Sequence, residues 1–281
     1  MTQQFAHPEL LVTPEWLHAH LTDPAVRIVD GRDAAKYAAG HIPGAVLVDF
    51  YALNTTDTSP AGMQAWIARM EEAFSAAGIA DGQTVVFYEE VSGQLAARGL
   101  WALCYLGHDG GRLLDGGLRA WQAAGYPLTT EPATVARTTF RARPRPELVA
   151  TYEDILARLG TGEAQLLDVR RTSEYEGTEI RAPRGGRIPG AIHFEWVHNL
   201  DAAGRFKAPA ELEAQYARLG LTREREVITY CQGGYRSANT WLVLHLLGYP
   251  RVRNYVGSWA EWGSREGLPI EHLTLPSQES R

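Results

Sequence analysis

The sequence contains the same ordered set of short motifs twice, and this repeat constrains the fold more than any other feature. The peptide His41-Ile-Pro-Gly-Ala45 returns as Arg187-Ile-Pro-Gly-Ala191, and Thr84-Val-Val-Phe-Tyr88 returns as Glu226-Val-Ile-Thr-Tyr230. The matched pieces keep their order, and each second copy lies about 140 residues after the first, close to half of the 281-residue chain. Solenoid repeats are only ~20–50 residues long, so this pattern indicates a duplicated domain.

The repeat predicts two domains of one fold joined by a linker. We place the first domain at residues 1–130, the linker at 131–148 and the second domain at 149–281. The linker region is rich in proline, threonine and arginine and lacks periodicity, which is typical of an extended connection. Its four arginines, between positions 137 and 145, offer a surface for an anionic partner. The simpler interpretation, which we favour, is a solvated linker that packs along both domains.

Short apolar segments alternate with longer amphipathic segments in each half. Segments typical of strands lie at 26–29, 84–88, 112–114, 165–169, 226–230 and 252–255. Segments with helical periodicity lie at 62–77, 94–106, 209–219 and 236–247. This alternation predicts an α/β fold, in which each domain has a parallel sheet flanked by helices on both faces. Ligands of such sheets bind beyond the carboxyl ends of the strands, which directs attention to the residues after Tyr88 and Tyr230.

Composition narrows the class of protein. The chain has a net charge of −6, which argues against nucleic acid or an anionic membrane surface as its main partner. No run approaches the ~20 apolar residues that span a bilayer. Two cysteines cannot build a disulfide framework, and the N-terminus lacks the basic and then apolar pattern of a secretory signal. We therefore expect a cytoplasmic protein with no nucleic-acid or membrane partner.

The most specific segment is the loop after Tyr230, which reads Cys231-Gln232-Gly233-Gly234-Tyr235-Arg236-Ser237. The two glycines let successive backbone amides turn inward as a nest for an anion. The following helix adds the positive end of its dipole, and Arg236 adds a full positive charge. These effects favour a thiolate over a thiol, so we predict that Cys231 is a nucleophile near neutral pH. The alternative is a buried structural cysteine, but the glycines and the arginine favour a catalytic role for Cys231.

With this loop in place, the chain resembles the tandem-domain rhodanese family of sulfurtransferases. The resemblance rests on the Asp-x-Arg motif at Asp168 and Arg170, the Ile-Pro-Gly-Ala motif at 188–191, the loop at 231–237 and the closing segment at 254–263. It covers essentially the whole chain. It implies two tandem rhodanese-like α/β domains, an active cysteine in the second domain only, and activity of the thiosulfate sulfurtransferase type.

The resemblance also implies a mechanism. The Cys231 thiolate would take the outer sulfur of a small anionic donor such as thiosulfate and hold it as a persulfide. A thiol, cyanide or protein acceptor would then remove that sulfur. The backbone amides from Gln232 to Ser237 would stabilise the thiolate and then the persulfide. Ser237 can also cap the helix, and Tyr235 can either gate the site or simply pack.

We expect neither a metal nor an organic cofactor. The nine histidines show no spacing typical of zinc ligands, and no glycine-rich nucleotide fingerprint follows a strand.

The first half serves as an internal comparison. Glu89 stands where the second half has Cys231, and Glu90 follows it. A carboxylate cannot carry sulfane sulfur, and a second carboxylate would repel an anionic substrate. We therefore predict that the first domain is catalytically silent and closes one wall of the pocket. Cys104 lies in an apolar helical segment and is predicted to pack.

Arginines near the loop are candidates for binding the donor, and they are Arg170, Arg184, Arg187 and Arg236. Arg170 directly follows a predicted strand, where it can clamp the donor or pair with Asp168 or Glu174. Since the silent half also carries the Asp-x-Arg motif, at Asp30 and Arg32, we favour structural support as the role of Asp168. Arg184 and Arg187 lie in a glycine-rich loop that also contains Arg181.

Other functions stay open at this point. Relatives that use 3-mercaptopyruvate often carry an anion-binding arginine close to where Glu174 stands, and a Cys-Gly-Ser-Gly loop, so thiosulfate is favoured. Tyrosine phosphatases place five residues between cysteine and arginine, whereas four separate Cys231 from Arg236, and no general acid is evident near the loop. A third possibility is a non-catalytic sulfur-relay module, in which the cysteine carries sulfur delivered by a partner protein.

Overall fold

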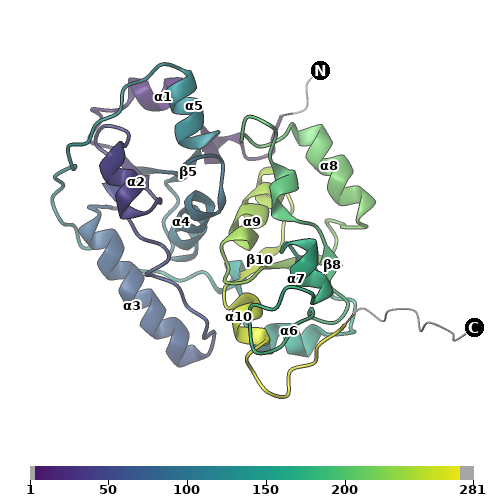
Figure 1. The fold of residues 1–281 in the computed structure, drawn as a ribbon. Coiled ribbons are helices and arrows are strands. Elements are labelled where there is room, and N and C mark those ends of the chain that lie inside the picture. The colour runs from purple at the N-terminus through teal and green to yellow at the C-terminus, as the bar shows by residue number, and fades with distance from the viewer. Residues whose placement is uncertain (1–3, 273–281) are drawn as a thin grey trace, which may run out of the picture.

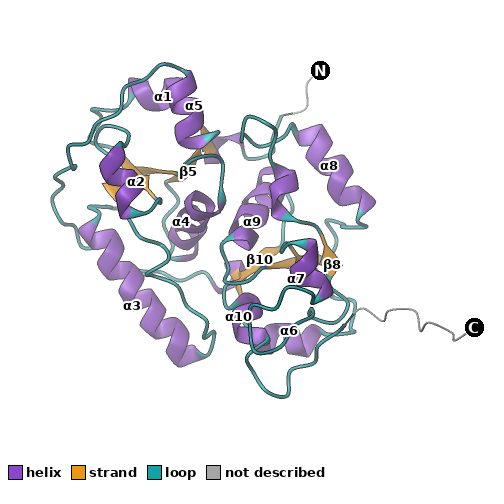
Figure 2. Cartoon of the chain, in the orientation of Figure 1, coloured by secondary structure: helices purple, strands orange, loops and turns teal. Residues whose placement is uncertain are grey.

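Each half of the chain folds around a five-stranded parallel sheet with helices on both faces (Figures 1 and 2). The structure is a computed structural model, which describes residues 4–272. The strand order is β1-β5-β4-β2-β3 in the first sheet and β6-β10-β9-β7-β8 in the second. The two orders are equivalent, and all the pairings within both sheets are parallel. The predicted α/β class and the duplication are both confirmed.

The two domains use matching elements. The first contains strands β1 (Leu11–Val12), β2 (Val26–Asp30), β3 (Val46–Leu47), β4 (Thr84–Tyr88) and β5 (Gly111–Leu114), with helices α1 (Pro14–Ala19), α2 (Ala34–Ala39), α3 (Pro60–Ala76), α4 (Gln94–Tyr105) and α5 (Gly117–Ala123). The second contains strands β6 (Val149–Ala150), β7 (Ala164–Asp168), β8 (Ile192–His193), β9 (Glu226–Tyr230) and β10 (Val252–Tyr255), with helices α6 (Tyr152–Arg158), α7 (Thr172–Glu176), α8 (Pro209–Arg218), α9 (Arg236–Leu246) and α10 (Ser258–Trp262). Short 3₁₀ helices are η1 (Pro8–Leu10), η2 (Pro146–Leu148) and η3 (Trp196–Asn199).

Every strand and helix predicted from periodicity is present, with ends that differ by one or two residues. The helix predicted from position 62 begins at Pro60, because the Ser59 side chain accepts a hydrogen bond from the Gly62 amide and caps it. The four edge strands β1, β3, β6 and β8 were not predicted. Each has two residues, which is too short for a periodic pattern.

The repeated Ile-Pro-Gly-Ala motif forms the same turn in both domains. Gly44 and Gly190 have φ of 81° and 74°, the positive value that a type II turn requires after proline. The buried tyrosine that ends the adjacent central strand holds each turn. The Tyr88 hydroxyl accepts from the Ile42 amide at 3.1 Å, and the Tyr230 hydroxyl accepts from the Ile188 amide at 3.2 Å. The motif therefore belongs to the framework of the fold.

The domains meet through α4 and α9, which pack against each other (Figure 1). Almost every residue of these two helices is buried, and one apolar cluster continues from the first domain into the second. Because both helices are buried around nearly their whole circumference, separating the domains would expose apolar surface to water. The contact therefore fixes the two sheets relative to each other.

The linker lies along the first domain. Arg137 pairs with Glu72 at 2.5 Å and Arg143 pairs with Asp81 at 3.1 Å, while Phe140 is buried. Arg145 also pairs with an acidic residue of the first domain, at 2.7 Å. Three of the four linker arginines thus have partners within the protein, and these ion pairs attach the linker to one domain rather than to both.

The cysteine loop leads directly into helix α9, so the packing of α9 holds the site in place. Leu242 is fully buried in α9, and Leu156 of α6 is 44% exposed. We expect Leu242→Ala to lower the free energy of unfolding by about 2–5 kcal/mol, because it leaves a cavity. Leu156→Ala should change it by less than about 1 kcal/mol. Urea unfolding followed by tryptophan fluorescence measures both, and equal losses would contradict the packing described.

Candidate active site

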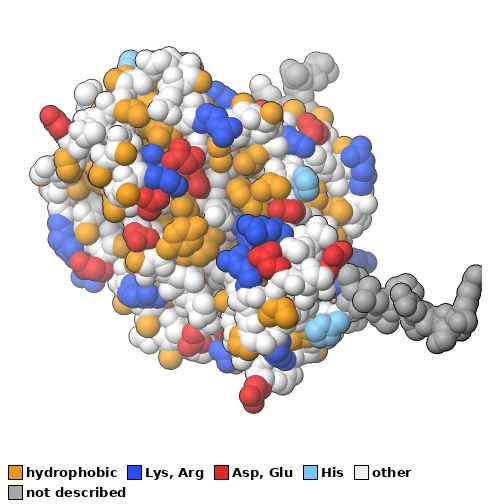
Figure 3. Space-filling model, viewed as in Figure 1, with side chains coloured by type: hydrophobic (Ala, Val, Ile, Leu, Met, Phe, Trp, Pro, Cys, Tyr) orange, Lys and Arg blue, Asp and Glu red, His pale blue; other side chains and the backbone are white. Residues whose placement is uncertain are grey.

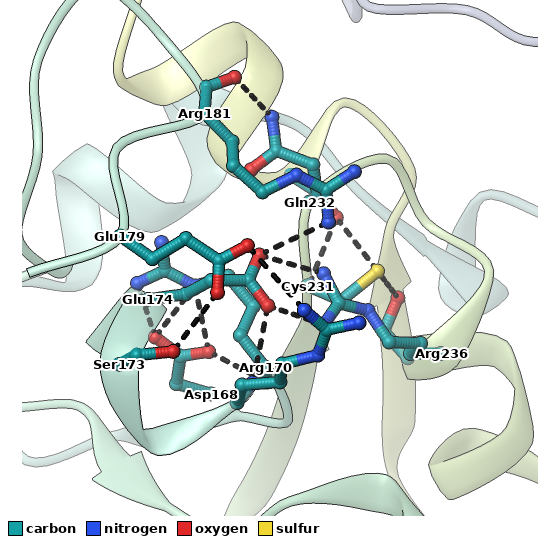
Figure 4. Close-up of polar contacts among 12 residues, drawn as sticks. Asp168, Arg170, Ser173, Glu174, Glu179, Arg181, Cys231, Gln232 and Arg236 are labelled. Carbon is teal, nitrogen blue, oxygen red and sulfur yellow. Dashed lines mark hydrogen bonds and ion pairs between the residues drawn. The ribbon is translucent and has the colours of Figure 1, made fainter. Parts of the chain in front are cut away.

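Cys231 lies between the end of β9 and the start of α9, with its side chain 1% exposed (Figure 4). The Gly234 amide donates to its Sγ at 3.2 Å, and the hydroxyl of Ser237 lies 3.6 Å from the sulfur. Gly234 has φ of 83°, and a side chain there would meet the Val256 carbonyl at 2.6 Å. The tight turn thus requires glycine at this position.

Two opposing effects set the pKa of Cys231. Burial raises it, because the thiolate loses its hydration. The positive charge of Arg236 and the hydrogen bonds from the Ser237 and Gly233 amides lower it, and together they outweigh burial. The pKa of Cys231 therefore lies below its usual value. In contrast, burial raises the pKa of Cys104 to about 12.

The backbone of the loop is held by the segment that begins α10. The Ser258 hydroxyl accepts from the Cys231 amide at 3.1 Å, and the Trp259 amide donates to the Cys231 carbonyl at 2.9 Å. Ser258 has φ of 51°, a strained value for a residue with a side chain, whereas Gly117 takes 56° at the matching place in the first domain. Serine at this position has a strained backbone, but its hydroxyl provides a hydrogen-bond acceptor that glycine lacks.

Arg236 lines the cavity, and its positive charge is paired with the carboxylate of Glu174. Its two terminal nitrogens bind the two carboxylate oxygens of Glu174 at 2.5 and 2.9 Å, and the Glu174 side chain is fully buried (Figure 4). Arg181 adds a second cation 3.5 Å from Glu174, with its side chain 46% exposed. The carboxylate therefore orients one arginine beside the sulfur and holds a second at the surface.

A cavity of about 580 Å³ opens above the sulfur, and both domains form its walls. The first domain contributes Tyr51, Asn54 and Gln94, and the second contributes Cys231 and its loop with Arg171, Arg181, Glu195, Trp196, Val197 and Ala260. The first domain thus forms one wall, as the sequence predicts. Figure 3 shows positively charged and hydrophobic side chains side by side near the boundary of the domains.

Asp168 and Arg170 form a buried ion pair, with the Arg170 Nη2 atom 2.6 Å from a carboxylate oxygen. Arg170 also donates to the Gly186 carbonyl at 2.8 Å. The silent domain repeats this arrangement. Arg32 pairs with Asp30 at 2.7 Å and donates to a backbone carbonyl at 2.7 Å. Because the pair recurs in the domain whose equivalent loop has Glu89 in place of a cysteine, it supports the loops of the fold.

The structure corrects the expectation that Arg170, Arg184 and Arg187 bind the donor, since none of the three lines the cavity. Arg184 donates to the backbone carbonyls of residues 262, 263, 265 and 268 and so fixes the chain after α10. Arg187 pairs with Glu271 and lies over the ring of Tyr175 at 4.5 Å. The hydrogen-bond partners of Arg184 and Arg187 lie 78 to 84 residues away in the sequence.

The remaining loop residues have separate partners. Gln232 lines the cavity and donates through its side chain to the Arg181 carbonyl at 2.9 Å. The Tyr235 hydroxyl donates to the Phe50 carbonyl at 2.9 Å, which ties the loop to the first domain. Tyr235 is therefore anchored and packed.

In the first domain, Glu89 occupies the place of the cysteine. Its carboxylate accepts from the amides of Leu95 and Ala96, at the start of α4. Burial raises the pKa of Glu89 to about 7, although these two hydrogen bonds act in the opposite direction. Its own carboxylate thus fills the anion site of this domain. Among residues 4–272, no cluster of histidine, cysteine and acidic side chains is placed to hold a metal ion, and no helix is long and apolar enough to cross a membrane.

Sequence reasoning missed several residues of the site. Arg171, Trp196 and Tyr51 line the cavity but lie outside the loop motif. Ser258 lies in the closing segment at 254–263, which carries part of the family resemblance. Nothing in the sequence indicates its contact with Cys231. The sequence places Glu174 close to where relatives that use 3-mercaptopyruvate carry an arginine. Apart from their opposite charges, nothing in the sequence indicates that Glu174 pairs with Arg236.

Comparison with known proteins agrees with this geometry. The family model of the rhodanese-like domain matches residues 13–124 and 151–265. The chain is 36% identical to the sulfur carrier protein TtuD of Thermus thermophilus, over 95% of this chain and 98% of that protein. It is 35% identical to a thiosulfate sulfurtransferase of Azotobacter vinelandii, with the same coverage. A structure of EanB with ergothioneine covalently linked to a cysteine persulfide matches with a TM-score of 0.84 and 26% identity, covering 96% of this chain and 71% of that one.

The two cysteines should differ strongly in reactivity. We expect iodoacetamide to modify Cys231 before Cys104 at neutral pH, because the pKa of Cys231 is lowered and that of Cys104 is raised. The rate at Cys231 should already be substantial at a pH where free cysteine is mostly protonated. Peptide mass spectrometry of the native protein follows both sites, with Cys104→Ser as the control. Similar rates at the two sites would contradict the proposed environment.

The repeated ion pair allows a matched test of its role. Asp168→Asn and Asp30→Asn each remove the buried carboxylate that pairs with a buried arginine, which should lower the free energy of unfolding by about 3–5 kcal/mol. After Asp30→Asn, Arg32 keeps a contact with the half-exposed Glu90 at 3.3 Å, which is weakened by solvent. Urea unfolding of both variants is the measurement. Comparable losses are expected, because the geometry is the same in both domains. A loss of activity with full stability in Asp168→Asn alone would point instead to a role in binding substrate.

Proposed function

This chain belongs to the rhodanese family, and we propose that it is a thiosulfate sulfurtransferase that carries sulfur as a persulfide on Cys231. The observation that supports this most is the environment of the sulfur. A cysteine with a lowered pKa lies at the base of an open cavity, within a turn of backbone amides. These features suit a nucleophile that must hold a negative charge before and after it gains a sulfur atom.

The proposed reaction has two displacement steps. The Cys231 thiolate attacks the outer sulfur of thiosulfate, the sulfur–sulfur bond of the donor breaks, and sulfite leaves with the bonding electron pair. The enzyme then holds a persulfide anion on Cys231. An acceptor nucleophile, which is a thiol, cyanide or a protein thiol, attacks the terminal sulfur and regenerates the thiolate. The sulfur atom transferred is already at the sulfane level, so the cycle needs no external oxidant or reductant.

The residues of the cavity divide this work. The amides of Gly233, Gly234 and Ser237 face the charged sulfur. Arg236 lies beside it and is proposed to hold the anionic part of the donor. The side chains of Arg171 and Arg181, which are 60% and 46% exposed at the cavity, attract anions from solution. The neutral aromatic wall formed by Tyr51 and Trp196 leaves space for an acceptor larger than cyanide.

We propose that the reaction uses neither a metal nor an organic cofactor, because the cysteine itself forms and breaks the covalent bonds. We also propose a cytoplasmic location. Both Cys104 and Cys231 are free thiols, and a persulfide cycle requires its cysteine to remain reduced.

The alternatives are not favoured. Cysteine phosphatases place five residues between cysteine and arginine, whereas four separate Cys231 from Arg236. Relatives that use 3-mercaptopyruvate often carry an anion-binding arginine close to where Glu174 stands, and this chain lacks an arginine at that position. A non-catalytic sulfur-relay module would also carry a persulfide on Cys231, but it would show no turnover with small sulfur donors. A turnover assay therefore distinguishes it from a sulfurtransferase.

Incubation with thiosulfate should add one sulfur atom to the intact protein, located on Cys231, with release of sulfite. Cys231→Ser should gain no sulfur, and Cys104→Ser should behave as the wild type does. Intact-mass spectrometry, combined with sulfite and thiocyanate assays, measures each step. Sulfur gain by Cys231→Ser would refute the nucleophile. Turnover with 3-mercaptopyruvate but not with thiosulfate would refute the donor, and the absence of turnover with both would refute the enzyme.

A further inference from the structure

Arg98 of the first domain is a buried cation whose charge has no carboxylate partner in the part of the chain that the structure describes. It lies in α4 and is 2% exposed. No acidic side chain within residues 4–272 forms an ion pair with it, and its Nη2 atom has no hydrogen-bond partner among them. Its guanidinium lies 5.2, 4.7 and 5.3 Å from the rings of Trp66, Trp101 and Tyr235. Burying a charge in this way is costly and calls for a reason.

The contacts of Arg98 lead to the cysteine loop of the other domain. Its Nη1 atom donates to the Gly234 carbonyl at 3.4 Å, and Asn254 donates to the same carbonyl at 3.1 Å. The amide of Gly234 donates to the Cys231 sulfur at 3.2 Å. With its carbonyl held on one side by two donors, Gly234 keeps its amide turned toward the sulfur. Arg98 therefore acts on the residue that touches the reacting atom.

The duplication shows what this cation adds. Ser92 occupies the position in the first loop that Gly234 occupies in the second, and its carbonyl also accepts from the helix of the opposite domain. There the donor is the neutral side chain of Asn239 in α9, at 2.8 Å. The silent loop is thus held by an amide, and the cysteine loop is held by a positive charge. Holding the carbonyl does not in itself require a cation.

The charges around the sulfur give the cation a role. Arg236 lies beside Cys231, but its charge is shared with Glu174 through a bidentate pair. The cations Arg171 and Arg181 line the same cavity, but each is paired with a carboxylate, Glu179 at 3.4 Å and Glu174 at 3.5 Å. The phenols of Tyr51 and Tyr235 also interact with the sulfur and carry no positive charge. Burial lowers the pKa of Arg98 to about 10, while Tyr235 and Cys231 act in the opposite direction, so Arg98 remains charged at neutral pH.

We propose that Arg98 is a positioning residue of the sulfurtransferase site, through which the first domain fixes the Gly234 peptide and stabilises the charged sulfur of Cys231. This inference rests on the proposed function and extends it. The domain that carries no nucleophile contributes a charge to the nucleophile of its neighbour.

The test compares three variants. Arg98→Gln keeps a donor for the Gly234 carbonyl and removes the charge, whereas Arg98→Lys keeps the charge. Arg119→Gln is the matched control, because Arg119 also reaches from the first domain to a carbonyl of the second at 3.4 Å, that of Ala202, away from Cys231. The primary measurement is the pH dependence of Cys231 alkylation by iodoacetamide, which requires no sulfur transfer. Thiosulfate turnover is measured beside it.

We expect Arg98→Gln to move the alkylation midpoint to higher pH and to lower the alkylation rate at neutral pH by about tenfold, the effect typical of losing one nearby opposite charge. Arg98→Lys should restore most of this rate, and Arg119→Gln should match the wild type. Sulfur transfer by Arg98→Gln should fall in parallel.

Two results would overturn the proposal. One is an unchanged midpoint in Arg98→Gln, and the other is an equal shift in Arg98→Gln and Arg98→Lys, which would indicate packing rather than charge. If Arg98→Gln does not fold, Arg98→Met provides the same removal of charge in an apolar side chain of similar length. A wild type that alkylates as expected but transfers no sulfur would refute the proposed function and leave the role of Arg98 standing.

Discussion

A negative charge on a buried sulfur atom costs free energy unless donors and cations surround it, and most features of the second domain meet this constraint. The glycines after Cys231 turn amides toward the sulfur, and α9 begins at once so that its first amides face the same point. Glu174 holds Arg236 beside the sulfur, and Ser258 accepts the Cys231 amide at the cost of a strained backbone. The Asp168–Arg170 pair lies outside this set, since it serves the fold in both domains.

The duplicated chain separates what the fold needs from what the chemistry needs. Both copies keep the parallel sheet, the turn at Ile-Pro-Gly-Ala and the buried aspartate–arginine pair. The loop after the central strand differs in its chemistry. In the first copy the carboxylate of Glu89 accepts hydrogen bonds from the amides at the start of α4. The anion site of this domain is therefore filled by its own side chain. The same framework thus binds the carboxyl group of its own side chain in one domain and leaves the other open for a reactive anion.

The sequence predicted the fold and the position of the nucleophile because both depend on local patterns. Parallel strands are apolar runs, their helices are periodic, and the cysteine loop is one contiguous segment. The two-residue strands carried no pattern, and the roles of the arginines depended on partners far away in the chain. Arg187 pairs with Glu271 and Arg98 reaches Gly234, at separations of 84 and 136 residues. Charge alone made every arginine near the loop a candidate, and only the fold shows which guanidinium groups already have partners.

The contact between α4 and α9 explains how a domain without a nucleophile is tied to the site. Each helix starts at one of the two equivalent loops, and each donates a hydrogen bond to the loop of the opposite domain, through Arg98 or Asn239. Since one apolar cluster continues across this contact, the two loops cannot move apart without exposing it to water. The hydroxyl of Tyr235 adds a further bond, to Phe50 of the first domain. The geometry around Cys231 is therefore a property of the pair of domains, and a second domain taken alone would lose one cavity wall, the Arg98 cation and the anchor of its loop together.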